Sequence, residues 1–239
     1  MLSHSFEDLA QTFRGLTEAH FNFYRLVSLD RGEAIGHIET AINAMLNAFH
    51  NLYDLMGQNN LNSIDWYDTP ELCVILAMRN ARHHNKANRI RSLYNFHRYE
   101  MDDPTQSEIY IYVSFPAGSD EEGGSFFDIP LSWSDLSELI NMPRQESRLR
   151  ATAKGYIREY LNADAFENEA KKAGIATDKI FINFVPLAMN AGKSLYPHVK
   201  DHIRTDSVEA SYFLSHFEKV GAAQTHEPSS DIIEFRLPK

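Results

Sequence analysis

The sequence predicts a mainly α-helical protein: a helical bundle with a small β hairpin or sheet in its C-terminal half. Two observations carry this expectation. Apolar residues recur at helical spacing through most of the first hundred residues, and a later run at 109–115 is rich in β-branched and aromatic residues. The chain has 239 residues, 43% of them apolar, which is enough for an ample core.

The N-terminal part is expected to form three long helices. Apolar stripes predict the first two, at residues 5–28 and 33–56. The third begins with a start signal, in which the Thr69 hydroxyl can cap the helix, Pro70 takes the first helical position and Glu71 follows. Because this third helix is almost entirely apolar up to Met78, we expect it at the centre of the bundle.

The segment that follows Met78 is expected to continue in helical register through Ile90, Leu93 and Tyr94 to Tyr99. After about residue 103 the pattern changes. A boundary there would divide the chain into a helical bundle, 1–103, and an α+β extension, 104–239, whose role the sequence does not indicate. One continuous domain with a small β appendage is an equal alternative.

In the C-terminal half, the run at 109–115 predicts a strand, the acidic, glycine-rich residues 117–124 a turn, and residues 126–129 the return strand of a hairpin that Pro130 ends. Helices are expected at 134–140, 143–162, 164–173 and 198–220, and a strand at 232–237. Residues 181–189 are apolar and fit a strand or a helix equally well.

Composition excludes several classes of protein. The N-terminus lacks the basic and apolar regions of a signal peptide, and no window approaches the 18 apolar residues of a membrane span, so we expect a cytoplasmic protein without membrane contact. The single cysteine, Cys73, excludes an internal disulfide framework and a cysteine-based zinc site. It lies in an apolar run, which favours a buried structural thiol.

Charge is unevenly distributed along a chain of net charge −10. Residues 1–78 carry ten acids and three arginines, whereas residues 79–98 carry six basic residues and no acid. The basic segment 79–98 could attract a polyanion such as RNA, although the net charge argues against nucleic acid. Alternatively, it is a solvated helix face that pairs with acidic neighbours.

One octet, 78–85, holds the groups that phosphodiester chemistry needs. Arg79 offers a permanent cation with a planar fork of donors for phosphate oxygens. The neutral amide of Asn80 can orient an imidazole, and His84 can transfer protons near neutral pH. Other pairs of Arg and His at similar spacing occur in the chain, but only Arg79 is followed directly by Asn.

The segment Arg79-Asn80-Ala81-Arg82-His83-His84, placed in a bundle of long helices, resembles the signature of the HEPN superfamily. This resemblance covers residues 5–100 at most. It implies a metal-independent endoribonuclease that activates the 2′-hydroxyl of its RNA, as in toxin–antitoxin or anti-phage systems. Arg79, Asn80 and His84 would be catalytic, and no metal or organic cofactor would be needed. Arg82, His83, Lys86 and Arg89 would bind the RNA backbone.

Several alternatives stay open. On a straight helix residues 79 and 84 diverge, whereas His83 lies one turn from Arg79, so His83 could be the working imidazole. Two proton transfers from one His per site favour a homodimer with a shared cleft. A non-catalytic helical protein that binds a protein partner, an antitoxin for example, or a nucleotide through the basic segment is the rival interpretation. His198 and His202, four residues apart, fit a metal site weakly.

Overall fold

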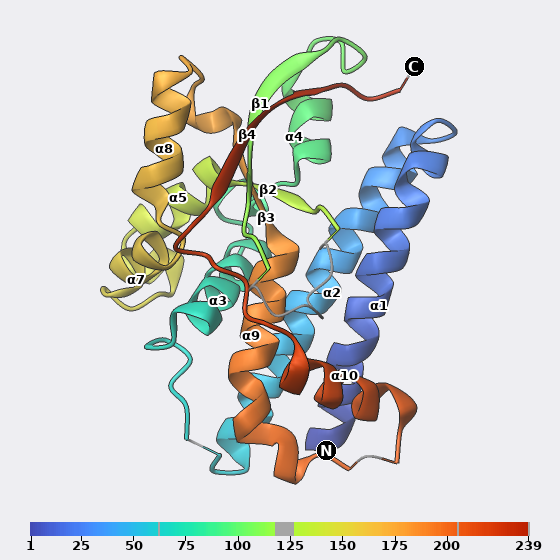
Figure 1. The fold of residues 1–239 in the computed structure, drawn as a ribbon, viewed down its shortest axis with the longest axis vertical. Helices are drawn as coiled ribbons and strands as arrows, with labels where there is room; N and C mark the ends of the chain where they lie inside the picture. The colour runs from blue at the N-terminus through green and yellow to red at the C-terminus, as the bar shows by residue number, and fades with distance from the viewer. Residues whose placement is uncertain (62, 118–126, 205, 239) are drawn as a thin grey trace.

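The computed structural model describes residues 1–61, 63–117, 127–204 and 206–238. It confirms the predicted fold class: the described residues are mainly α-helical, with one small four-stranded sheet (Figure 1). Most of the predicted glycine-rich turn, from residue 118 on, and Phe126 of the predicted return strand lie outside the described residues.

Helices α1 (Leu2–Val27) and α2 (Arg31–Gln58) form a long antiparallel pair along one side of the molecule (Figure 1). Their bounds agree closely with the predicted ones because the apolar stripes decide them. The break between them is set by Asp30, whose side chain caps α2 by accepting a hydrogen bond from the Glu33 backbone N–H at 2.9 Å.

Helix α3 (Pro70–His83) begins where the sequence predicts and is central, with residues Leu72–Met78 almost fully buried. It packs between α2, α7 (Ala153–Tyr160) and α9 (Phe184–Val199). This position fixes the orientation of its polar last turn, which carries Arg79 and His83.

The predicted helical continuation after α3 is wrong. The chain instead turns through the short 3-10 helix Ala87–Arg89 and starts a new helix, α4 (Leu93–Glu100). Five residues of this turn adopt left-handed backbone conformations: Asn85, Ala87, Asn88, Arg89 and Ile90. Of these residue types only asparagine adopts such conformations readily, so Ala87, Arg89 and Ile90 did not indicate a turn. The apolar residues at 90–99 are spaced as in a helix and did not reveal the break before α4.

The sheet has the order β2-β3-β1-β4, with β1 (Glu108–Ser114), β2 (Pro130–Ser132), β3 (Ile180–Asn183) and β4 (Ser229–Phe235). The predicted hairpin is wrong. Strand β1 pairs in parallel with β3 and antiparallel with β4, and Pro130 begins edge strand β2 instead of ending a strand. Pro130 lacks an N–H and is tolerated there because β2 is at the edge of the sheet.

The remaining helices are α5 (Trp133–Asn141), α6 (Arg144–Ser147), α8 (Ala163–Lys172) and α10 (Val208–Lys219). The predicted helix 143–162 is therefore two helices, α6 and α7, and the predicted helix 198–220 is interrupted between α9 and α10. The ambiguous stretch 181–189 contains both structures, since β3 ends at Asn183 and α9 starts at the next residue.

A single large core cluster contains buried side chains from both sides of residue 103. The C-terminal helices cover this core, and α10 packs on α1. The Phe217 ring of α10 packs so closely on Gly192 of α9 that a Cβ at position 192 would lie 2.4 Å from a ring carbon. Within the described residues, no helix combines the length and the apolarity needed to cross a bilayer.

Candidate functional site

A pocket of about 270 Å³ lies where the last turn of α3 faces α2. We call it the α2–α3 pocket. Its lining is mostly polar and basic: Asn43, Leu46, Asn47, Arg79, Arg82, His83 and Arg89. Three of the four residues predicted to bind RNA are therefore brought together with Arg79.

Arg79 and His83 are one helical turn apart, so both side chains point to the same side of α3. The Nε atoms of Arg79 and Arg82 are both buried without a hydrogen-bond partner in the described part of the chain, but Arg79 differs from Arg82 because no ion pair holds its guanidinium among the residues described. Burial lowers its pKa, an effect that the nearby Asp54 carboxylate opposes. An arginine with unused donors at a pocket is available to bind an anion.

Helix α2 carries a polar stripe next to this site. Asn43 and Asn47 line the pocket, and His50 and Asp54, which are not among the lining residues, follow them at three- or four-residue spacing. The Nδ1 atom of His50 is 3.2 Å from Oδ2 of Asp54. Burial lowers the pKa of His50, the positive charges of Arg79 and His83 lower it further, and Asp54 raises it. His50 is thus close enough to interact electrostatically with both Arg79 and His83.

The other two residues predicted to be catalytic do not line the α2–α3 pocket. The buried side chain of Asn80 points toward α6, where its Nδ2 donates to the Ser147 carbonyl at 3.4 Å. His84 follows the last residue of α3 and is exposed, with its ring packed edge-on against that of His83 at 4.8 Å between centroids. Partial desolvation and the neighbouring charges of His83 and Arg148 lower the pKa of His84.

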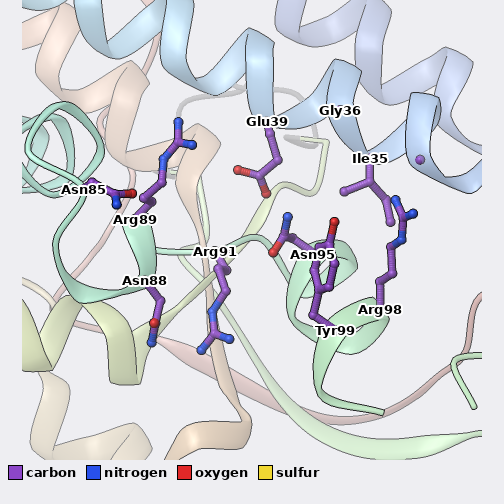
Figure 2. Close-up of a pocket in the computed structure, with 11 residues that line it drawn as sticks. Ile35, Gly36, Glu39, Asn85, Asn88, Arg89, Arg91, Asn95, Arg98 and Tyr99 are labelled. Carbon is purple, nitrogen blue, oxygen red and sulfur yellow. The ribbon is translucent and has the colours of Figure 1, made fainter. Parts of the chain in front are cut away.

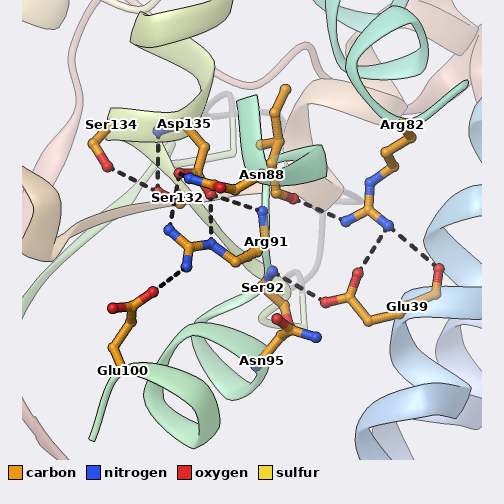
Figure 3. A network of polar contacts seen from close by, with 11 residues as sticks. Glu39, Arg82, Asn88, Arg91, Ser92, Asn95, Glu100, Ser132, Ser134 and Asp135 are labelled. Atoms are coloured by element: carbon orange, nitrogen blue, oxygen red, sulfur yellow. Dashed lines mark hydrogen bonds and ion pairs between the residues drawn. The ribbon is translucent and has the colours of Figure 1, made fainter. Parts of the chain in front are cut away.

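Arg82 and Lys86, both predicted to bind RNA, form ion pairs with acidic residues of the protein. Arg82 is buried and forms an ion pair with Glu39 at 2.9 Å, and it also donates to the Ile90 carbonyl (Figure 3). Lys86 pairs with Glu146 at 3.2 Å. Arg89, by contrast, is exposed and forms no ion pair within the described part of the chain.

The left-handed turn after α3 is held by one carboxylate. Asp135 of α5 is buried and accepts hydrogen bonds from the Asn88 side chain and from both the backbone and the guanidinium of Arg91 (Figure 3). Glu39 connects α2 to the same turn through Arg82 and through the backbone N–H of Ser92. These contacts hold the turn that places Arg89 in the lining of the pocket.

Chemically, the site combines a guanidinium with unused donors, two imidazoles and neutral amides. Such a set can bind a phosphate group and transfer protons on either side of it. Among the described residues there is no group of three or more His, Cys, Asp or Glu side chains that could hold a metal ion. His198 of the weak metal candidate instead faces Ser63, whose Oγ is 2.7 Å from its Nδ1.

Comparison of the chain with family models, curated proteins and solved structures finds no match. The site is therefore argued from its own geometry. Sequence reasoning missed His50, Asn43 and Asn47. Their spacing on the polar side of α2 was the available signal, but only the packing of α2 against α3 distinguishes it from an ordinary solvated face.

Proposed function

We propose that this protein is a metal-independent endoribonuclease of HEPN type whose active site is the α2–α3 pocket. The observation that carries the proposal is the partially buried Arg79 guanidinium, which has no hydrogen-bond or ion-pair partner among the residues that the structure describes, with His83 on its own helix and His50 on the facing one. The terminal guanidinium nitrogens of Arg79 are not among the buried atoms and have no ion pair in the described part of the chain, so they can donate to an anionic substrate. The resemblance of residues 79–84 to the HEPN signature points to the same chemistry.

In this mechanism the Arg79 guanidinium binds the non-bridging oxygens of the scissile phosphate. His50 is the general base: its Nδ1 faces Asp54, so Nε2 is left to accept the proton of the RNA 2′-hydroxyl. The depressed pKa of His50 keeps this imidazole neutral near pH 7. The 2′-oxygen then bonds to phosphorus as the bond to the 5′-oxygen breaks.

His83 is the general acid, which donates a proton to that leaving 5′-oxygen. The products are a 2′,3′-cyclic phosphate and a 5′-hydroxyl, and Arg79 stabilises the negative charge that develops on the phosphoryl oxygens. With His50 and His83, one protomer supplies both proton transfers. A homodimer, as well as a toxin or phage-defence role, stays a prediction of the resemblance.

The test is RNA cleavage by the purified protein in EDTA, with analysis of the product ends. We expect 2′,3′-cyclic phosphate ends, and cleavage about 10²-fold slower or more in His50→Ala and His83→Ala. His37→Ala is the matched control, since His37 pairs with Glu33 on the same helix outside the pocket. His84→Ala should retain most of the activity.

Intact RNA with the wild-type protein would refute the proposal, as would equal activity of His50→Ala, His83→Ala and the His37→Ala control. If only His84→Ala abolished cleavage, the working imidazole would be His84 and not His83.

A non-catalytic interaction protein is the second candidate. Its support is the pairing of half the basic segment with acids: Arg82 with Glu39, Lys86 with Glu146, and Arg91 with Asp135. These three residues stabilise the fold, as the rival interpretation of the basic segment expects. Arg79, Arg89 and Arg98 have no such partners in the described residues, which favours the nuclease.

A further inference from the structure

A second and larger pocket, of about 510 Å³, lies beside the α2–α3 pocket (Figure 2). We call it the α2–α4 pocket, because it lies between the first turns of α2, the left-handed turn and α4. Its lining consists of Gly32, Ile35, Gly36, Glu39, Asn85, Asn88, Arg89, Arg91, Asn95, Arg98 and Tyr99. Three arginines in one pocket raise the question of which charges are free to bind a ligand.

Two of the four charged side chains in the lining are neutralised by the protein. Glu39 is paired with Arg82, and Arg91 with Asp135 and Glu100. Arg89 and Arg98 form no ion pair among the described residues. The pocket therefore presents two guanidinium groups without a carboxylate partner, a charge pattern that suits a phosphate.

Small residues on α2 create the space. Gly32 and Gly36 are one turn apart, so both contribute to the same side of the helix. A Cβ on Gly32 would lie 3.1 Å from a guanidinium nitrogen of Arg98 and 3.2 Å from Oδ1 of Asp30, the residue that caps α2, so the glycine allows Arg98 to lie close to the start of α2. A Cβ on Gly36 would meet nothing within 4 Å, which shows that this position opens into the pocket.

Helix α4 adds groups suited to a base. Figure 2 shows Asn95 and Tyr99 side by side on α4, both directed toward α2. The Tyr99 side chain is 67% exposed, and the guanidinium carbon of Arg98 lies over its ring at 5.3 Å from the ring centroid. Aromatic rings stack on nucleobases with little regard to sequence, and an amide can both donate to and accept from a base edge.

The two pockets are neighbours. Arg89 lines both of them. Along α2, Gly32 and Gly36 line the α2–α4 pocket, and Asn43 and Asn47, further along the same helix, line the α2–α3 pocket. A strand whose scissile phosphate is bound at Arg79 would therefore reach the α2–α4 pocket with the next part of its backbone.

We propose that the α2–α4 pocket binds a nucleoside phosphate unit of the RNA strand, next to the unit that is cleaved. Arg98 binds its phosphate, Tyr99 stacks on its base, and Asn95 contacts the base edge. Arg89, on the opposite side of the pocket, binds the phosphate on the side of the α2–α3 pocket (Figure 2). The placement beside the scissile phosphate depends on the proposed function. Recognition of a nucleoside phosphate does not, because it follows from the lining of this pocket alone.

The test measures binding of a fluorescently labelled octamer of 2′-O-methyladenosine, which has no 2′-hydroxyl and cannot be cleaved by the proposed mechanism. Gly36→Met fills the pocket, and Arg98→Met removes one phosphate ligand. We expect each to weaken binding at least tenfold. Gly15→Met is the matched control, since Gly15 is also an exposed helical glycine with open space at its Cβ, but on α1. Circular dichroism checks that all variants are folded.

The proposal is wrong if Gly36→Met and Arg98→Met both bind the octamer as the wild type does. If 5′-AMP alone binds as tightly as the octamer, recognition of a nucleoside phosphate is supported, but the placement of that unit on an RNA strand is wrong. The two proposals fail differently. Octamer binding that depends on Gly36 and Arg98, with unmodified RNA left intact, refutes only the nuclease. Normal cleavage with unaltered binding by the variants refutes only this pocket.

Discussion

At the scale of single residues, Arg82 and Arg79 of α3 differ in whether the protein itself balances their charge. Arg82 is buried and its charge is balanced by Glu39, with further hydrogen bonds to Asn43 and to the turn. Arg79 is partly buried and its charge has no direct partner among the described residues. The first arginine stabilises the structure, whereas the second has donors to offer to a ligand.

This difference predicts a large loss of stability for one substitution and almost none for the other. Arg82→Met leaves Glu39 without its cation and should lower the free energy of unfolding by about 3 kcal/mol. Arg79→Met removes an unsatisfied donor and should leave it within about 0.5 kcal/mol of the wild type. Urea denaturation of both variants measures this. A large loss in Arg79→Met would assign that arginine to the architecture.

At the scale of elements, contacts between segments explain what the sequence could and could not predict. Helices α1, α2 and α3 were predictable because apolar stripes and end signals at Asp30 and Pro70 are local. The turn after α3 was not, because it is held by Asp135, more than forty residues away. The same limit applies to the site. Arg79 and His83 could be predicted from the sequence because they lie in one local motif, whereas His50 is recognised only from the packing of α2 on α3.

A second contact between elements joins α4 to β1. The buried imidazole of His97 donates from Nε2 to the Pro104 carbonyl at 3.0 Å, so Nδ1 accepts from the Tyr110 hydroxyl at 2.8 Å. This pattern requires the neutral ring. Burial lowers the pKa of His97, and the Pro104 carbonyl and Glu108 only partly oppose it.

Stability should therefore fall as the pH falls below about 6.5, the ordinary pKa of histidine. In that range the unfolded chain binds a proton at His97 that the folded chain does not, so the free energy of unfolding decreases by up to about 1.4 kcal/mol per pH unit. His20 and His50 also have lowered pKa values and add to the slope. Denaturation of wild type and His97→Gln between pH 7.5 and 5 isolates the contribution of His97. Parallel curves would contradict it.

At the scale of the whole molecule, the fold concentrates positive charge on an otherwise acidic protein. A continuous helix over residues 79–98 would spread its six basic residues along about 30 Å. The turn instead folds the segment back, so that Arg79, Arg89 and Arg98 all line two adjoining pockets on α2. The net charge of −10 therefore does not describe the surface that RNA would meet.

RNA binding should accordingly depend on salt as expected for three phosphate contacts. The logarithm of the binding constant should fall with the logarithm of salt concentration with a slope of about −2, and Arg79→Met, Arg89→Met or Arg98→Met should each reduce that slope by about 0.7. Arg14→Met is the control, because Arg14 pairs with Glu209 elsewhere. Fluorescence anisotropy across a salt series measures the slopes. A slope that none of the three variants changes would mean that RNA binds another surface.

The order of strands in the sheet has a consequence for synthesis on the ribosome. Strand β1 ends at Ser114, but its antiparallel partner β4 begins only at Ser229. At an elongation rate of about 5–20 residues per second, that edge of β1 stays unpaired for roughly ten seconds, until β4 has been synthesised. During this time the nascent chain presents an unpaired strand of alternating Ile and Tyr residues, which is a template for association with other chains. When the protein is overexpressed, association of incomplete chains should therefore limit the yield of folded protein. Slower growth at lower temperature should increase that yield.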